Sequence, residues 1–289
     1  MEFAFDRGNT AVVGRRRGGR RQVLDGGLDT ADPRIERAGA VATIVIDNPG
    51  RRNALNFAMW CALGEAIDAL EADTEIRCLI VRGEGNEAFA SGADISEFDA
   101  MRADPETAAR YNIACEYAMD RLAAVQKPTI AMVQGFCIGG GMALAVGCDI
   151  RIVAGNARFA IPAAKLGVGY DYRGIERLAK LVGPSRAKEI FFTARIFNVE
   201  EAEAMGLVSR LVSVDHLAAE TKAYAELIAA NAPLTIAAVK MAVANALAEP
   251  HERNLEACKA AEQACFASED YAEGRRAFAE KRKPVFHGR

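Results

Sequence analysis

The fold of this chain is decided by one stretch, Thr129-Ile-Ala-Met-Val-Gln-Gly-Phe-Cys-Ile-Gly-Gly-Gly-Met-Ala-Leu-Ala-Val-Gly-Cys-Asp149. Its apolar first part predicts a buried strand, Gly139-Gly140-Gly141 predicts a turn, and the apolar residues that follow predict a buried helix. Glycines at a helix start let a ligand approach backbone N–H groups that the helix leaves unpaired. Those donors, with the helix dipole behind them, stabilise an oxygen that gains negative charge.

A second turn of the same character lies earlier in the chain, in Phe89-Ala-Ser-Gly-Ala-Asp-Ile95. Two such turns facing one another would form an oxyanion hole built wholly from backbone. The alternative is that the glycines only allow tight packing of a strand on a helix, because lone glycine motifs are weak signals. A membrane-spanning interpretation of residues 129–149 is disfavoured by Gln134, the glycines and the following Asp149-Ile-Arg151.

Composition describes an ordinary globular protein of 289 residues, 51% of them hydrophobic and 26% charged. A net charge of −3 gives no electrostatic case for binding nucleic acid or an anionic membrane. The 7 cysteines are scattered through apolar segments, which indicates reduced core residues and a cytoplasmic location. The 3 histidines are far apart in the sequence, so we expect no metal site.

The first residues differ in composition from the rest. Residues 1–34 are rich in arginine, including Arg15-Arg16-Arg17 and Arg20-Arg21, and no apolar stretch follows the arginines. This pattern is not that of a secretory signal. We expect residues 1–34 to be a flexible basic extension.

Short strands and helices then alternate. We predict strands at 41–47, 78–82 and 149–153, helices at 57–70 and 107–125, and a loop over 83–92. The alternation predicts an α/β fold with mostly parallel pairing, which makes up a core over residues 35–213.

The second half of the chain is mostly helical. Asn198 and Glu201 form a capping-box pattern, and Gly206 suits the end of that short helix. A strand at 207–212 precedes helices at 214–231, 233–248 and 250–267. Because three such helices cannot all cover one sheet, residues 214–289 are predicted to pack on one another and on a neighbouring subunit.

Several segments together resemble one known family. They are Asn48-Pro-Gly-Arg-Arg-Asn-Ala-Leu-Asn56, Ala88–Ile95, Val133–Gly141, Cys148-Asp-Ile150, Phe159-Ala-Ile-Pro162, Leu166-Gly-Val-Gly169, Ala202–Val212 and Asp270–Pro284. On these residues the sequence resembles the crotonase (enoyl-CoA hydratase/isomerase) superfamily, in register from about residue 35 onward.

The resemblance implies a spiral of ββα repeats, assembled as homotrimers or hexamers through the C-terminal helices. It implies an acyl-CoA substrate, whose coenzyme A is part of the substrate rather than a separate cofactor. The backbone N–H groups of Ala93 and Gly140 would be the oxyanion-hole donors. Coenzyme A would be bound by Arg52, Ala54, Ala93, Asp94, Ile95, Gly140, Phe278 and Lys281. Phe278 and Lys281 would close the adenine end, often in a neighbouring subunit, although Lys281 also suits a solvated basic helix end.

The sequence departs from the family at two positions. Hydratases of this superfamily use two glutamates, and the matching positions here are Ala143 and Ala163. Alanine can act as neither acid nor base, so ordinary hydration is not expected. Asp171 matches a position where some family isomerases and dehalogenases carry a functional aspartate. It also precedes an apparent helix, so capping is an equal alternative.

Two classes of function remain open at this point. The leading hypothesis is an enzyme on acyl-CoA thioesters, of the enoyl-CoA hydratase/isomerase type, with isomerase-like or decarboxylase-like chemistry. The alternative is a protein that binds or scaffolds CoA thioesters without turnover. RNA binding through the arginine-rich segment ranks third, because the net charge of −3 gives it no support.

Overall fold

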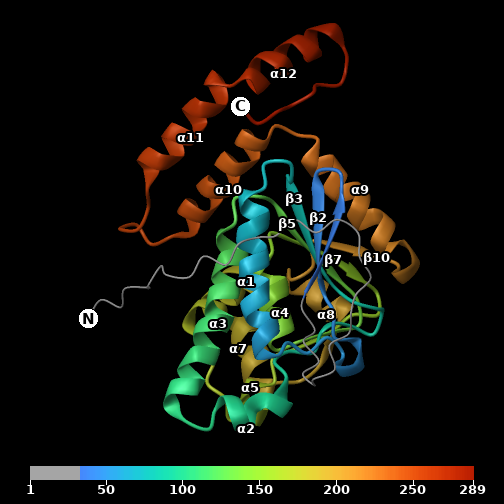
Figure 1. The fold of residues 1–289 in the computed structure, drawn as a ribbon, viewed down its shortest axis with the longest axis vertical. Coiled ribbons are helices and arrows are strands. Elements are labelled where there is room, and N and C mark those ends of the chain that lie inside the picture. The colour runs from blue at the N-terminus through green and yellow to red at the C-terminus, as the bar shows by residue number, and fades with distance from the viewer. Residues whose placement is uncertain (1–32) are drawn as a thin grey trace, which may run out of the picture.

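The computed structural model describes residues 33–289, as one body with a helical arm at its C-terminal end (Figure 1). The predicted basic extension therefore lies almost entirely outside the described residues. A first sheet has the strand order β1-β2-β3-β5-β7-β10, in which only β1 is antiparallel to its neighbour. Its strands are β1 (Arg34–Ala38), β2 (Val41–Ile46), β3 (Cys78–Gly83), β5 (Thr129–Val133), β7 (Ile150–Ala154) and β10 (Arg210–Val212).

A second, smaller sheet has the order β4-β6-β8-β9. Its strands are β4 (Ala88–Ala90), β6 (Phe136–Ile138), β8 (Arg158–Ala160) and β9 (Phe197–Asn198). The chain passes from β3 to β4, from β5 to β6 and from β7 to β8. Each repeat of the spiral therefore contributes one strand to the first sheet and one to the second, and helices follow. The predicted spiral of ββα repeats is confirmed.

Two helical layers cover the first sheet. One layer is formed mainly by α1 (Phe57–Ala72), α3 (Pro105–Ala124) and α4 (Gly140–Gly147), whose buried side chains join the larger apolar core. The other is α9 (Leu217–Ala229), which packs on β2, β3, β5 and β7. The inner strands β2, β3, β5 and β7 are buried on both faces because parallel sheets take helices on each side, whereas the edge strands β1 and β10 are largely exposed.

The remaining helices do not belong to these two layers. They are α2 (Phe98–Met101), α5 (Ala163–Leu166), α6 (Tyr172–Val182), α7 (Pro184–Thr193), α8 (Val199–Ala204), α10 (Pro233–Leu247), α11 (Leu255–Ala267) and α12 (Glu269–Glu280). Single 3-10 turns occur at η1 (Pro49–Arg51), η2 (Ile95–Glu97) and η3 (Val214–His216). The Asn198–Glu201 capping box is present, with Gly206 at a φ of 80° just beyond the helix.

Three local predictions were wrong. The predicted loop over 83–92 contains β4, whose three residues are a strand only because β6 lies beside them. The predicted strand at 207–212 is limited to β10, where β7 supplies a partner. The predicted helix at 250–267 begins at Leu255, because Asn254 caps it by accepting a hydrogen bond from Ala257.

Helices α10, α11 and α12 form the arm that stands off the body (Figure 1). Neither α10 nor α11 has a buried residue, and an apolar groove of about 1030 Å³ runs between the three helices. The only one of the predicted C-terminal helices that covers the sheet is α9. Among residues 33–289 no single helix is long and apolar enough to cross a membrane. The segments Val214–Ala229 and Pro233–Leu247 reach the required length and apolar composition only when taken together, and the chain bends by 102° between them.

Candidate active site

The first glycine turn follows β4. Leu55 donates its backbone N–H to Gly92 at 2.8 Å and accepts from the N–H of Asp94 at 2.8 Å. Successive N–H groups along an extended chain point to opposite sides, so Ala93 directs its own N–H away from Leu55. In the described part of the chain this N–H has no hydrogen-bond acceptor.

The second glycine turn joins β6 to α4. Gly139 has a φ of 54°, which favours glycine, and it donates its N–H to Ala160 at 2.8 Å. Gly140 is the first residue of α4, so its N–H belongs to the donors that the helix leaves unpaired. Behind it, a Cβ on Gly141 would lie 2.3 Å from the carbonyl oxygen of Ala90, and only glycine fits there.

The two turns meet face to face. A Cβ placed on Gly92 would lie 3.5 Å from the nitrogen of Gly140, and one placed on Gly140 would lie 3.6 Å from the nitrogen of Ala93. Two unpaired amide donors are therefore brought to one place by strands β4 and β6, which are neighbours in the second sheet. An oxygen that gains negative charge would be stabilised in front of them.

An ion pair fixes the segment that follows Ala93. Arg51 contacts both carboxylate oxygens of Asp94 at 2.9 Å through Nη1, and it also donates to Ser96. Burial works to raise the pKa of Asp94, but hydrogen bonds from Ser96 and the charge of Arg51 outweigh it and hold that pKa below its usual range. Asp94 is thus an anion at neutral pH that ties the 51–56 segment to the first turn.

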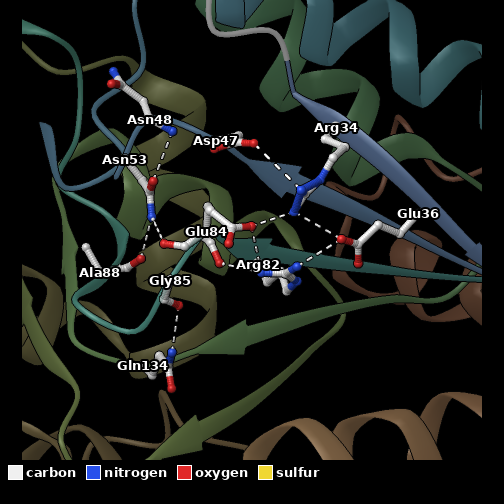
Figure 2. A network of polar contacts seen from close by, with 11 residues as sticks. Arg34, Glu36, Asp47, Asn48, Asn53, Arg82, Glu84, Gly85, Ala88 and Gln134 are labelled. Carbon is white, nitrogen blue, oxygen red and sulfur yellow. Dashed lines mark hydrogen bonds and ion pairs between the residues drawn. The ribbon is translucent and has the colours of Figure 1, made fainter. Parts of the chain in front are cut away.

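Asn53 provides a second tie, which the sequence analysis missed. Its side-chain amide donates to the carbonyl oxygens of Glu84 at 2.9 Å and Ala88 at 2.7 Å, while its oxygen accepts from the N–H of Asn48 (Figure 2). The residue is only 1% exposed and has a φ of 57°, a conformation that asparagine tolerates better than most residues. The sequence signal that would have identified it is an asparagine in an Arg-Asn-Ala turn directly after a strand.

A cavity of about 210 Å³ opens in front of the two amides. Ala143 on α4 and Ala163 at the start of α5 both line it, so the two positions that lack the family glutamates do face the site. The other lining residues are mainly apolar, including Trp60, Ile95, Phe98, Met119, Ile161, Leu166 and Val168. Within this lining, Asp171 is the acidic side chain.

Asp171 combines the two roles that the sequence left open. Its Oδ2 accepts a hydrogen bond from the N–H of Gly174 at 3.0 Å, which caps α6. Its Oδ1 makes no hydrogen bond within residues 33–289, and the residue lines the cavity. Next to it, Tyr170 packs edge-on against Phe191 at 4.9 Å and lines the cavity, whereas Tyr172 is 73% exposed.

The expected coenzyme A residues lie in two separate places. Arg52 lies over the Phe136 ring at 5.1 Å, Ala54 is buried two residues further along the chain, and Ile95 is 60% exposed and lines the cavity. Phe278 lines the groove of the arm, and Lys281 ends α12, at the far end of the molecule from α2 and α5 (Figure 1). One chain alone does not bring these two residues to the glycine turns.

No group of three or more potential metal-ligating side chains occurs among residues 33–289. The site that the geometry describes consists of backbone donors, an apolar cavity and one carboxylate.

The family model of enoyl-CoA hydratase/isomerase matches residues 36–289. The chain belongs to this family. A short-chain-enoyl-CoA hydratase of Clostridium acetobutylicum is 36% identical over 249 residues, which cover 86% of this chain and 95% of the relative. A crotonyl-CoA hydratase of Syntrophomonas wolfei is 34% identical over 252 residues, which cover 87% of this chain and 96% of the relative.

The fold of this family member is also shared with solved structures. An enoyl-CoA hydratase/carnithine racemase from Magnetospirillum magneticum matches with a TM-score of 0.82 and 41% sequence identity, over 88% of this chain and 95% of that one. An enoyl-CoA hydratase from Bacillus anthracis matches with a TM-score of 0.83 and 29% sequence identity, over 89% of this chain and 99% of that one. The predicted family and the mixed α/β architecture are both confirmed, and relatives named as hydratases support an enzyme of this type.

Proposed function

We propose that the cavity binds a coenzyme A thioester, whose carbonyl oxygen accepts hydrogen bonds from the backbone N–H groups of Ala93 and Gly140. One observation carries this proposal: two unpaired amides are neighbours at the cavity wall, because a Cβ on Gly140 would lie 3.6 Å from the nitrogen of Ala93 and both residues line the cavity. Donors held rigidly at such a position stabilise the enolate that forms when the thioester loses a proton from Cα. The same interaction makes that proton easier to remove.

The chemistry proposed for this enolate is proton transfer rather than hydration. Syn-addition of water requires an acid and a base, and Ala143 and Ala163 provide neither. Asp171 supplies one carboxylate, capping α6 with Oδ2 and leaving Oδ1 without a partner. In an isomerisation Oδ1 would remove a proton from one carbon and return it to another, so that the double bond moves and no atom is gained or lost.

The second candidate function is binding of the thioester without turnover. It is favoured by the same two alanines and by the capping bond of Asp171, which requires no catalysis to explain it. RNA binding would depend on arginines outside the described residues.

We also propose that the arm joins copies of this chain into a trimer or hexamer. The exposed apolar side chains of α10–α12 support this, because Val239, Phe266 and Phe278 are 58%, 60% and 87% exposed. In such an assembly Phe278 and Lys281 of one copy would reach the coenzyme A bound by another. Arg52, Ala54, Asp94 and Ile95 would bind the same molecule from within the chain that holds the thioester.

The test is a panel of acyl-CoA thioesters, scored first for binding by thermal shift and then for products by mass spectrometry. A ligand of the folded state should raise the melting temperature in step with the logarithm of its excess over Kd. A product isomeric with its substrate supports the isomerase. Binding of many thioesters without any product supports the second candidate function, binding without turnover. If no thioester changes the melting temperature, the site assignment is contradicted.

A further inference from the structure

The backbone N–H of Ala93 can serve as an oxyanion donor when the chain that follows β4 runs in one fixed direction. β4 has 3 residues, and its pairing with β6 is irregular between Ala88 and Ala90. So short and irregular a pairing leaves the direction of the next residues to other contacts. The turn of residues 48–56 provides them.

Leu55 in this turn contacts the chain on both sides of Ala93. It donates its N–H to the carbonyl oxygen of Gly92 and accepts the N–H of Asp94 at its own carbonyl oxygen, each at 2.8 Å. Leu55 and Ala93 thereby form an isolated parallel bridge. Because these are backbone hydrogen bonds, the direction of the Ala93 N–H follows the position of the Leu55 backbone.

Asn53 holds that backbone from two residues away. Its Nδ2 donates to the carbonyl oxygens of Glu84 at 2.9 Å and Ala88 at 2.7 Å, and its Oδ1 accepts from the N–H of Asn48 at 3.1 Å (Figure 2). The side chain thus uses both of its amide hydrogens and its oxygen, and the residue is only 1% exposed. The Ala88 bond joins the turn to the first residue of β4, while Leu55 joins it to the residues that follow β4.

The first sheet holds the loop to which Asn53 donates. The carboxylate of Glu84 accepts hydrogen bonds from Arg34 on β1 and from Arg82 on β3 (Figure 2). A Cβ on Gly83 would lie 2.5 Å from Nδ2 of Asn53, so the glycine leaves the space that this amide fills. Asn53 therefore connects the turn to a sheet whose position is fixed by other contacts.

The second donor does not depend on Asn53. The position of the Gly140 N–H is set by α4, and Gly139 before it donates to Ala160 on β8 at 2.8 Å. A change at Asn53 should therefore affect one of the two donors and leave the other in place.

We propose that Asn53 is a positioning residue for the oxyanion hole, which sets the direction of the Ala93 N–H through Leu55. This inference rests on the proposed function, in which that N–H binds the thioester carbonyl. Asn53 does not line the cavity that residues 33–289 form, so its effect on a ligand passes through the backbone.

Two variants remove the amide donors in different ways. Asn53→Gly removes the side chain without backbone strain, because a φ of 57° suits glycine. Asn53→Asp keeps the shape and the acceptor for Asn48, but it places a carboxylate against two carbonyl oxygens. Thr129→Val is the matched control, because Thr129 is 0% exposed and bonds Asp149 at the end of β5 that is distant from β6. All three variants should lower the melting temperature, since each breaks buried hydrogen bonds.

The Ala93 amide can be observed by NMR in the ligand-free protein. Alanine directly follows glycine at two positions, Ala40 and Ala93, so ¹³C-carbonyl glycine with ¹⁵N-alanine gives two amide signals. Both Asn53 variants should shift the Ala93 signal and leave the Ala40 signal in place, whereas Thr129→Val should not shift the Ala93 signal. If neither Asn53 variant shifts the Ala93 signal, the inference is overturned without any ligand.

Butyryl-CoA with a ¹³C-labelled carbonyl then tests the effect on the thioester. Hydrogen bonds from the two donors lower the carbonyl stretching frequency in the infrared spectrum. They also speed deuterium uptake in D₂O, in which a Cα–H bond breaks and the solvent returns a deuteron. The Asn53 variants should regain part of the free frequency and slow the uptake by about 10–10²-fold at saturating ligand, as expected for a misplaced donor. Their Kd should change by less than about threefold, because the donors act mainly as charge develops.

The outcomes separate the inference from the proposed function. If the wild type does not bind butyryl-CoA, or binds it without a lower carbonyl frequency, the proposed function fails. If the wild type and both Asn53 variants lower the frequency equally, Asn53 has only a structural role and the inference is overturned. Thr129→Val should keep the wild-type frequency and uptake rate. A loss as large as that of Asn53→Gly would mean that general destabilisation explains the effect, and it would also overturn the inference.

Discussion

Asp171 accepts a hydrogen bond from the backbone N–H of Gly174 through Oδ2 at 3.0 Å, and its other oxygen is left without a partner at the wall of the cavity. A single carboxylate can therefore cap α6 and still present an oxygen to a ligand. Capping and proton transfer, which the sequence presents as alternatives, are compatible in the folded protein.

Replacing Asp171 separates these two roles. Asp171→Asn retains the capping oxygen, so the free energy of unfolding should be unchanged, while turnover of any isomerised acyl-CoA should be lost with binding intact. Asp171→Ala should cost about 0.5–2 kcal/mol as well, because the cap is removed. Urea denaturation and product analysis measure the two effects. If the asparagine variant turns over its substrate at the wild-type rate, Asp171 only caps α6 and has no catalytic role.

Two adjacent glycines should respond differently to alanine. A Cβ on Gly140 would lie 3.1 Å from Trp60 Cζ2, which a small shift of the indole relieves, but the methyl group would stand next to the Ala93 donor. Gly140→Ala should therefore fold, and turnover should fall by about 10²–10³-fold, the usual effect of losing one oxyanion donor.

Gly141→Ala is the matched change. Its Cβ would meet the Ala90 carbonyl oxygen at 2.3 Å, where the obstacle is backbone and cannot move aside. We expect a loss of about 3 kcal/mol in unfolding free energy, the upper end of overpacking costs. Denaturation curves and binding of butyryl-CoA distinguish the two variants. Equal destabilisation by both would mean that the turn serves packing only.

Hydration of crotonyl-CoA by the unmodified chain is expected to be very slow. A general acid or base typically increases the rate by about 10²–10⁴-fold, and neither Ala143 nor Ala163 can act as one. The double change Ala143→Glu and Ala163→Glu should increase the hydration rate, measured by loss of the enoyl absorbance. Ala164→Glu is the control, because Ala164 is exposed and does not line the cavity. Rapid hydration by the wild type would show that an acid elsewhere does this work.

The C-terminal segment is predicted to loosen in acid. Hydrogen bonds from Arg282 and from the N–H of Val285 hold the pKa of Glu273 far below its usual range. A depressed pKa contributes stability at pH values above the unfolded pKa of about 4.3, and that contribution is lost as the pH falls through the folded value.

Glu273→Gln should accordingly lower the melting temperature at pH 7, and the difference from wild type should shrink as the pH falls below about 4. Glu280→Gln is the control, because Glu280 is 52% exposed in its side chain and contacts only the Arg282 end of this network. A difference that does not vary with pH would mean that Glu273 acts through packing.

Association through the arm predicts a trimer or hexamer at micromolar concentration in sedimentation experiments. Val239→Asp, in the exposed face of α10, should shift the protein toward monomers because a charge would be buried in the interface. Ile113→Asp on α3 changes an equally exposed apolar residue outside the arm and should leave the assembly intact. A wild-type monomer would remove the proposed role of Phe278 and Lys281 at a neighbouring site.

The sequence by itself determined the local structures that a few neighbouring residues control. The first strand, the glycine turn and the helix of residues 129–149 and the capping box at Asn198 were predictable, because unpaired helix donors and side-chain caps depend on residues a few positions apart. The separate strand β6 within this stretch was not predicted, because it forms by pairing with β4 and β8 in the second sheet. The family was also predictable, since many short segments agree with it in order. The Asp171 cap followed from its place directly before a helix.

Only the tertiary structure decided which of these parts meet. The approach of Ala93 to Gly140 depends on the register of β4 beside β6, and β4 itself exists only through that pairing. The stacking of Phe57 on Tyr111 depends on how α1 and α3 pack together. The separate arm of α10–α12 results from competition for one sheet face, which α9 already covers. These features depend on contacts between segments that are distant in the sequence, and local sequence patterns do not determine strand register or helix packing.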